Sequence, residues 1–165
     1  MAARNERESR RTTVRKVSDS EVVVTRTFDA PARLVFEAWT KPELFRQWWV
    51  PRSMGMTLRS CDLDVRTGGS YRLVFGDDPA NTMAFFGTYL EVVPDQRIVW
   101  TNEESGDAAS VTTVTFEERD GTTLLVLTER YPSKDALDEA GTGAQDAMGE
   151  TFAQLDELLA ELVVR

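Results

Sequence analysis

The sequence predicts an α+β protein in which a curved antiparallel sheet of about six or seven strands wraps on a long C-terminal helix. Residues 144–162 carry the longest apolar stripe at helical spacing. Beyond residue 55 the chain alternates short β-type segments with turn residues, and connections this short join antiparallel neighbours. A sheet with one apolar face needs a cover, and we expect the long helix to provide it.

The chain begins with a polar, basic segment. Residues 1–19 contain six Lys or Arg and three acidic residues, whereas the rest of the 165-residue chain contains 13 basic and 25 acidic residues. We expect a flexible tail over 1–19 and a single domain over 20–165. The acidic body argues against nucleic-acid binding by the domain.

One strand and two short helices are expected next. Glu21–Phe28 is rich in β-branched residues and predicts the first strand. Asp29-Ala30-Pro31 is a helix-start signal, and a short helix is expected over 31–39. Thr40-Lys41-Pro42-Glu43 has the capping-box pattern, with Thr40 at the cap, and predicts a second helix that ends before Pro51.

The remaining strands are bounded by turn residues. We expect strands at 56–64, 70–75, 82–93, 97–101, 110–117 and 122–131. A loop is expected over 76–81, a bulge at Gly87, and a hairpin turn at Asp120-Gly121. Ser133 is expected to cap the C-terminal helical region. In the long helix, Gln145 and Gln154 fall on the side opposite the apolar stripe, and Thr151 is the one polar residue near the middle of the stripe.

Composition excludes several kinds of chemistry. The chain has no histidine, so Ser-His-Asp and Cys-His catalysis and His-ligated zinc or iron are excluded. No phosphate-binding glycine motif or EF-hand spacing is present, and no cofactor or metal is expected. The single cysteine, Cys61, and the lack of a signal-peptide core favour the cytoplasm. No apolar run approaches a membrane span, so no membrane insertion is expected.

Aromatic side chains are more numerous than a minimal core needs. Together with Met148 and Glu129, those expected to line a ligand cavity are Trp39, Trp48, Trp49, Tyr71, Phe75, Phe86, Trp100, Tyr131 and Phe152. The alternative is that each simply fills the space between sheet and helix. Adjacent helical residues point about 100° apart, so one of Trp48 and Trp49 should be buried and the other should lie at a cavity mouth or a subunit contact.

Glu129 is the one weak candidate for a catalytic group. If Thr123, Leu125, Leu127 and Glu129 share one face of their strand, this carboxylate faces the core near the strand's end. Burial there raises the pKa of a carboxyl group and suits a general acid or base. Arg72 and Arg97 are candidate partners. The plainer interpretation, a salt bridge at the rim or a place on the solvent face, is favoured.

Several stretches together resemble a known superfamily. They are TRTFDAPARLVFEAWTKPELFRQWW at 25–49, the Gly-Gly before YRLVF, FFGTYLEVVPDQRIVWTNEE at 85–104, TTVTFEERDGTTLLVLTERYPS at 112–133 and MGETFAQLDELLAEL at 148–162. They resemble the START-like, or SRPBCC, superfamily and within it the branch named for homologues of the activator of Hsp90 ATPase. The resemblance implies a helix-grip fold with a cavity between the last helix and the concave sheet.

The resemblance and the aromatic surplus favour a protein that binds an apolar, aromatic or lipid-like small molecule in that cavity, with Tyr71, Glu129, Tyr131 or Arg72 fixing its orientation. A cyclase- or hydrolase-like enzyme that uses a pocket carboxylate or tyrosine is the alternative, and whether the protein is an enzyme stays open. A co-chaperone or protein-interaction module is a further alternative. Pairing through an exposed tryptophan or an edge strand leaves a homodimer open as well.

Overall fold

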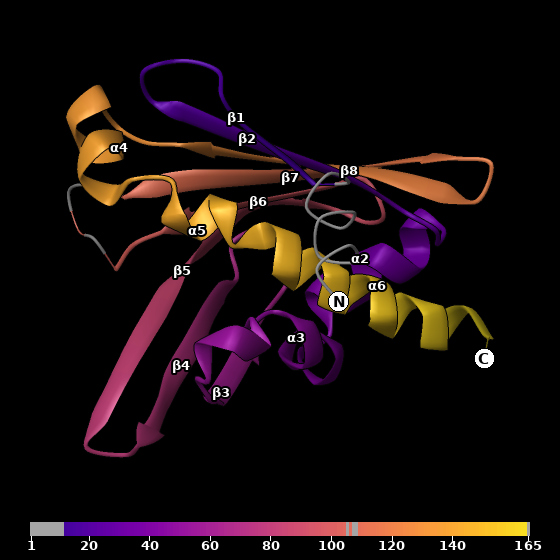
Figure 1. Ribbon diagram of the computed structural model, residues 1–165, viewed down its shortest axis with the longest axis horizontal. Helices are drawn as coiled ribbons and strands as arrows, with labels where there is room; N and C mark the ends of the chain where they lie inside the picture. Colours follow the sequence, from indigo (N-terminus) through magenta and orange to yellow (C-terminus); the bar gives the residue numbers. More distant parts are fainter. Residues whose placement is uncertain (1–11, 105, 107–108, 165) are drawn as a thin grey trace.

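Eight strands form one antiparallel sheet in the computed structural model, which describes residues 12–104, 106 and 109–164. The strand order is β1-β2-β8-β7-β6-β5-β4-β3 (Figure 1). The strands are β1 Thr13–Lys16, β2 Glu21–Phe28, β3 Leu58–Leu63, β4 Ser70–Asp78, β5 Asn81–Val93, β6 Arg97–Asn102, β7 Ser110–Arg119 and β8 Thr122–Arg130. The predicted α+β class and the curved antiparallel sheet covered by a C-terminal helix are confirmed.

The strand that the sequence did not predict is β1. It pairs antiparallel with β2, with Thr13 opposite Thr25 and Lys16 opposite Val22. The flexible tail expected over 1–19 is therefore wrong for residues 13–16, and its first 11 residues lie outside the described part of the chain. β1 carries little apolar surface, and its place is set by backbone pairing with the edge of β2.

Strand register follows from alternation of buried and exposed residues. On β2, Val22, Val24 and Phe28 are buried, and Val24 lies opposite Leu127 of β8. β7 and β8 are joined by the expected Asp120-Gly121 hairpin, whose two residues have φ of 53° and 81° as a type I′ turn requires.

The structure differs from the sequence predictions at two places in β4 and β5. The loop expected over 76–81 is shorter, because β4 extends to Asp78 and β5 begins at Asn81. Gly87 lies in a regular stretch of β5, and a Cβ placed there would lie 1.8 Å from the backbone oxygen of Thr101. The irregularity in pairing lies further along, between Tyr89 and Glu91. The close approach of two backbones therefore requires a glycine at position 87, and the bulge expected there lies further along the strand.

Two short helices follow β2, as expected, at α2 Ala32–Thr40 and α3 Pro42–Trp48, with a 3₁₀ turn, η1, at Arg52–Met54. The expected capping box is wrong. Lys41 is the N-cap residue of α3 and no side chain caps it, because the Thr40 hydroxyl donates back to the carbonyl of Phe36 at 2.9 Å. Pro42 opens the helix instead.

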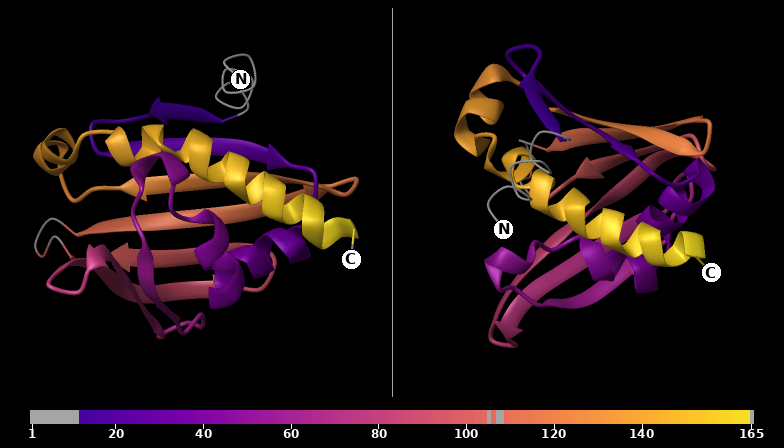
Figure 2. Two further views of the ribbon diagram at one scale, coloured as in Figure 1. Left: turned by 60° about the horizontal axis from the view of Figure 1, so that its bottom comes forward. Right: turned by 45° about the vertical axis from the view of Figure 1, so that its right-hand side comes forward.

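The C-terminal region is three helices: α4 Lys134–Ala140, α5 Gly143–Asp146 and α6 Met148–Val164. Ser133 caps α4 as predicted and accepts a hydrogen bond from the Ala136 amide at 3.1 Å. The single helix expected over 144–162 is interrupted at Ala147. Figures 1 and 2 show α2, α3 and α6 on the same face of the sheet, with α6 crossing the strands obliquely.

Buried polar side chains hold α6 in place. Gln154 is 5% exposed, and its amide nitrogen donates to the carbonyl oxygens of Trp48 and Val50, both at 2.9 Å. Its amide oxygen accepts from the Arg52 backbone amide at 2.9 Å. Arg26 of β2, 1% exposed, forms an ion pair with Asp156 of α6. The placement of Gln154 on the solvent side was wrong, because three backbone groups of the α3–η1 connection need partners there.

None of the helices within the described residues is long and apolar enough to span a membrane.

Candidate functional site

A pocket of about 780 Å³ lies between α6 and the concave side of the sheet. Its walls come from α2, α3, strands β3 to β8 and the helices α4 to α6. Most of the lining is apolar or aromatic: Trp39, Phe45, Trp49, Val50, Pro51, Met54, Met56, Leu63, Tyr71, Leu73, Phe75, Met83, Phe85, Tyr89, Ile98, Trp100, Leu127, Ala136, Ala140, Ala147 and Met148. The polar and glycine lining residues are Asn102, Glu104, Ser110, Thr112, Glu129, Tyr131, Glu139, Gly143 and Thr151.

Tryptophans form the wall under α2 and α3. The Trp39 ring lies 5.7 Å from the Trp49 ring and 5.8 Å from the Trp100 ring, measured between centroids. Trp48 is fully buried and donates through Nε1 to the Ala38 carbonyl at 2.9 Å. The expected division within the Trp48-Trp49 pair is confirmed: Trp48 packs in the core, and Trp49 faces the pocket.

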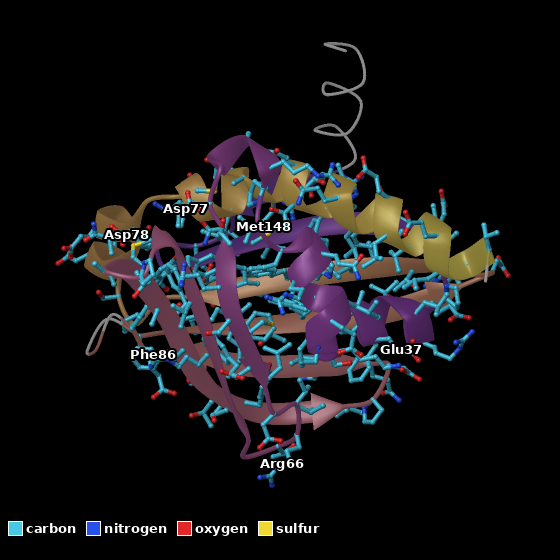
Figure 3. All side chains as sticks on the ribbon, turned by 90° about the horizontal axis from the view of Figure 1, so that it is seen from below. Glu37, Arg66, Asp77, Asp78, Phe86 and Met148 are labelled. Carbon is cyan, nitrogen blue, oxygen red and sulfur yellow. The ribbon has the colours of Figure 1, made fainter. Side chains whose placement is uncertain are left out.

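Eight of the eleven side chains expected to line a cavity lie on this pocket: Trp39, Trp49, Tyr71, Phe75, Trp100, Glu129, Tyr131 and Met148. The other three do not. Trp48 and Phe152 are fully buried behind the wall, and Phe86 is 39% exposed on β5. In Figure 3 Phe86 lies toward the left-hand edge of the molecule, while Met148 lies nearer its middle. The prediction that Phe86 lines the cavity is wrong, because β5 turns this side chain to the outside. Its neighbours on the strand are Phe85, which lines the pocket, and Gly87, which lies against β6.

Register brings Glu129 into the pocket. It pairs with Val22 of β2 on one side and Thr112 of β7 on the other, and Thr112 pairs in turn with Trp100 of β6. Residues paired across a sheet share a face, so this row of side chains points toward the helices. The favoured interpretation of Glu129, a rim salt bridge or the solvent face, is therefore wrong.

Four neutral side chains donate to the Glu129 carboxylate. Ser110, Thr112 and Asn102 contact Oε1 at 3.1, 3.4 and 3.4 Å, and the amide of Gln145 contacts Oε2. The same Gln145 amide lies 3.0 Å from the Tyr131 hydroxyl. These contacts join β6, β7, β8 and α5 into one polar end of the pocket.

The network extends from Asn102 to two aromatic residues. The Asn102 side-chain oxygen accepts from Trp100 Nε1 at 3.2 Å and from the Tyr71 hydroxyl at 3.1 Å. The Tyr71 hydroxyl also lies 2.8 Å from the Thr101 carbonyl. Asn102 therefore links Trp100 and Tyr71 to the polar end of the pocket.

The expected arginine partners of Glu129 lie elsewhere. Arg97 pairs with Glu91 at 3.4 Å, and both side chains are about half exposed. Arg72 is exposed, because on β4 it alternates with the buried Tyr71 and Leu73. Arg72 is accordingly also removed from the residues expected to orient a ligand.

Burial governs the electrostatics of the polar end. Burial raises the pKa of the Glu129 carboxyl, and the nearby Glu104 charge raises it further, while hydrogen bonds from Gln145, Ser110 and Thr112 oppose the shift. Burial also raises the pKa of the Tyr71 and Tyr131 hydroxyls, which stay protonated at neutral pH. The pocket thus presents one enclosed carboxyl group beside neutral donors.

Gln145 is the main residue of this site that the sequence did not reveal. It is 1% exposed, although helical spacing placed it on the solvent side. The interruption at Ala147 changes the phase between α5 and α6, so one helical wheel does not describe both. The inward direction of Ser110 and Thr112 could have been predicted from strand alternation, since both occupy the inward-facing positions of β7 and both are buried.

No group of three or more His, Cys, Asp or Glu side chains suited to a metal ion occurs within residues 12–104, 106 and 109–164. Cys61 lies outside the large pocket on β3, and burial raises the pKa of its thiol to about 11. A thiol with so high a pKa is a poor nucleophile at neutral pH.

A family model described as "Activator of Hsp90 ATPase homolog 1-like protein" matches residues 29–160. The search of curated proteins found no match. Among solved structures, a Rhodobacter sphaeroides protein is 23% identical over 92% of this chain and 99% of its own, with a TM-score of 0.78. A Staphylococcus epidermidis protein is 29% identical over 90% and 94%, with a TM-score of 0.75.

A Rhizobium leguminosarum protein is also 29% identical, over 86% of this chain and 95% of its own, with a TM-score of 0.68. These structures share the fold along nearly their whole length.

Proposed function

Because the chain belongs to the family of activator of Hsp90 ATPase homolog 1-like proteins and carries an aromatic pocket under its last helix, we propose that it binds an apolar or aromatic small molecule there. The observation that carries this proposal is the pocket itself. A volume of about 780 Å³ falls in the range of small-molecule sites, and its apolar walls end in a few convergent polar groups.

The walls favour a flat or flexible apolar ligand. Three tryptophans, Trp39, Trp49 and Trp100, offer large ring faces, and Met148 and Met56 offer side chains that adapt to irregular shapes. Burying about 250 Å² of apolar ligand surface contributes about 6 kcal/mol before the cost of ordering the ligand. Taken alone, about 6 kcal/mol corresponds to a Kd of roughly 40 μM, and the ordering cost weakens it, so polar contacts at the end of the pocket are needed for tighter binding.

The proposal is tested by filling the pocket from the helix side. Ala147 lines the pocket, whereas Ala160 is exposed on the same helical region. Binding of the neutral dye Nile red and of neutral aromatic compounds is followed by dye fluorescence and by quenching of the wall tryptophans. We expect Ala147→Phe to weaken binding at least tenfold and Ala160→Phe to leave it unchanged. Equal effects of the two variants, or no binding by the parent protein, refute the proposal.

A second candidate function follows from Glu129. A carboxyl group with a raised pKa, placed in a pocket, suits general acid–base catalysis of the cyclase or hydrolase kind. In such a reaction Glu129 moves a proton to or from the ligand, while the Tyr71 and Tyr131 hydroxyls orient it through hydrogen bonds.

This candidate is tested with compounds that bind. Each is incubated with the protein in deuterated water, and deuterium uptake, hydration or cyclisation is followed by mass spectrometry. We expect any turnover to be lost in Glu129→Gln while that variant still binds neutral ligands. Turnover that survives in Glu129→Gln, or no turnover of any bound compound, contradicts an enzymatic role.

The other expectations from the sequence remain predictions. A co-chaperone or interaction role is tested by a pulldown with Hsp90, and a homodimer by sedimentation of the purified chain. A cytoplasmic location, for which the single cysteine is the argument, is tested by fractionation of cells that express the protein.

A further inference from the structure

The charges on the pocket lining are all of one sign. Glu104, Glu129 and Glu139 line it, and none of the described lining residues is Lys or Arg. Burial raises the pKa of both Glu129 and Tyr71, and the nearby Glu104 charge raises both further, so Glu104 and Glu129 are close enough to interact. A bound ligand therefore meets a negative field at the polar end of the pocket.

Within the part of the chain that the structure describes, the donors to Glu129 are all neutral: two hydroxyls, from Ser110 and Thr112, and two amides, from Asn102 and Gln145. A carboxylate has about four acceptor positions spread over two oxygens and accepts more than one donor on each. Neutral donors orient the carboxylate and leave its charge in place. An enclosed charge without a cation is costly, and a cationic ligand group would offset that cost.

Two aromatic residues are linked to this carboxylate through one intervening polar residue each. Trp100 pairs across the sheet with Thr112, which contacts Glu129, and Tyr71 meets Trp100 through Asn102. Ring faces attract organic cations, and the attraction grows when the cation is removed from water. A carboxylate and aromatic rings that line one pocket are an arrangement that recognises an ammonium group attached to an apolar body.

We propose that the pocket selects an amphiphile whose apolar or aromatic body carries an amine, and that it rejects the same body carrying a carboxylate. This inference rests on the proposed function, since it names the class of ligand for the same pocket. The amine donates to Glu129 while the body lies against Trp39, Trp49 and Trp100. An anion in the same position faces Glu129 and Glu104, and no described lining residue offers it a compensating cation.

Three probes with one body test this selectivity: 2-naphthylmethylamine, 2-naphthalenemethanol and 2-naphthoate, titrated at pH 7.5 by calorimetry or tryptophan quenching. We expect the amine to bind at least tenfold more tightly than the carboxylate, with the alcohol between them. The variant Glu129→Gln keeps the shape of the side chain and removes its charge. We expect the preference for amine over alcohol to fall below about threefold in this variant.

The matched control is Glu117→Gln, which alters an exposed carboxylate paired with Arg119 and should leave all three affinities unchanged. If the alcohol and the carboxylate both bind as tightly as the amine, the selectivity is refuted while the pocket proposal stands. If the amine preference persists in Glu129→Gln, recognition by this carboxylate is refuted. If none of the probes binds the parent protein, the proposed function fails and this inference fails with it.

Discussion

The side-chain amide of Gln145 on α5 donates a hydrogen bond to the carboxylate of Glu129 on β8. It lies 3.0 Å from the Tyr131 hydroxyl as well, so one buried amide ties a short helix to two residues at the end of the last strand. Because Glu129 also accepts from β6 and β7, this contact closes the polar end of the pocket.

The first prediction concerns the pH dependence of stability. The folded-state pKa of Glu129 is raised by burial, so the stability that its neutral form contributes is fully present below the unfolded-state pKa and is lost as pH rises through the folded-state pKa. Glu129→Gln does not titrate. We measure the free energy of unfolding by urea denaturation at each pH. We expect the value for Glu129→Gln to increase relative to that of the parent as pH rises from acid to neutral, which means that the variant becomes relatively more stable.

Glu117→Gln serves as the control, and its difference from the parent should show no such rise. A difference between Glu129→Gln and the parent that is constant with pH would show that Glu129 has the same pKa folded and unfolded.

The second prediction concerns Gln145. Its hydrogen bond favours the charged form of Glu129 and lowers the pKa of that carboxyl, against the larger effect of burial. We expect Gln145→Ala to raise the pKa of Glu129 further, as read from the carboxyl carbon shift in a ¹³C NMR titration. The control is Gln96→Ala at an exposed position. An unchanged or lower pKa in Gln145→Ala contradicts the contact.

The third prediction concerns the anchoring of α6. Removing the Gln154 amide leaves the carbonyls of Trp48 and Val50 and the amide of Arg52 without this partner. Buried groups left unsatisfied cost about 1–3 kcal/mol each, partly relieved by water, so we expect Gln154→Ala to lose about 2–4 kcal/mol in urea unfolding. Gln47→Ala, at an exposed site on α3, should lose less than about 0.5 kcal/mol. Similar losses for both would refute the anchoring role.

The fourth prediction concerns backbone approach at Gly87. A Cβ there would lie 1.8 Å from the Thr101 oxygen and 2.9 Å from the Tyr71 ring, so β5 and β6 must separate to admit it. We expect Gly87→Ala to lose at least about 2 kcal/mol of stability. Gly143→Ala meets no atom within 4 Å and has no positive φ, and should gain about 0.4–1 kcal/mol through the unfolded chain. If Gly87→Ala leaves the free energy of unfolding unchanged, β5 and β6 separate at this point without cost.

Turn chemistry and alternation sufficed to predict most of the sheet. The hairpin at Asp120-Gly121 and the cap at Ser133 depend on local geometry, which residue type reports directly. β1 escaped prediction because its placement depends on pairing with β2 and on no apolar pattern of its own. The phase of Glu129 was undecided from the sequence because both faces of β8 are apolar.

The site was less predictable than the fold. Aromatic composition located much of the pocket wall, but Trp48 and Phe152 differ from Trp39 only in which side of the wall they occupy. That difference depends on tertiary packing: Trp48 is held in the core by its hydrogen bond to the Ala38 carbonyl, and Phe152 packs against Phe28 of β2.

The central claim, that the space between α6 and the sheet is a ligand site, is tested most directly by a crystal structure of the protein with 2-naphthalenemethanol. The account predicts density for the naphthyl ring against Trp39, Trp49 and Trp100, with its hydroxyl directed to the Glu129 end of the pocket. An interior filled by these side chains, with the compound absent or bound only at the surface, would contradict it.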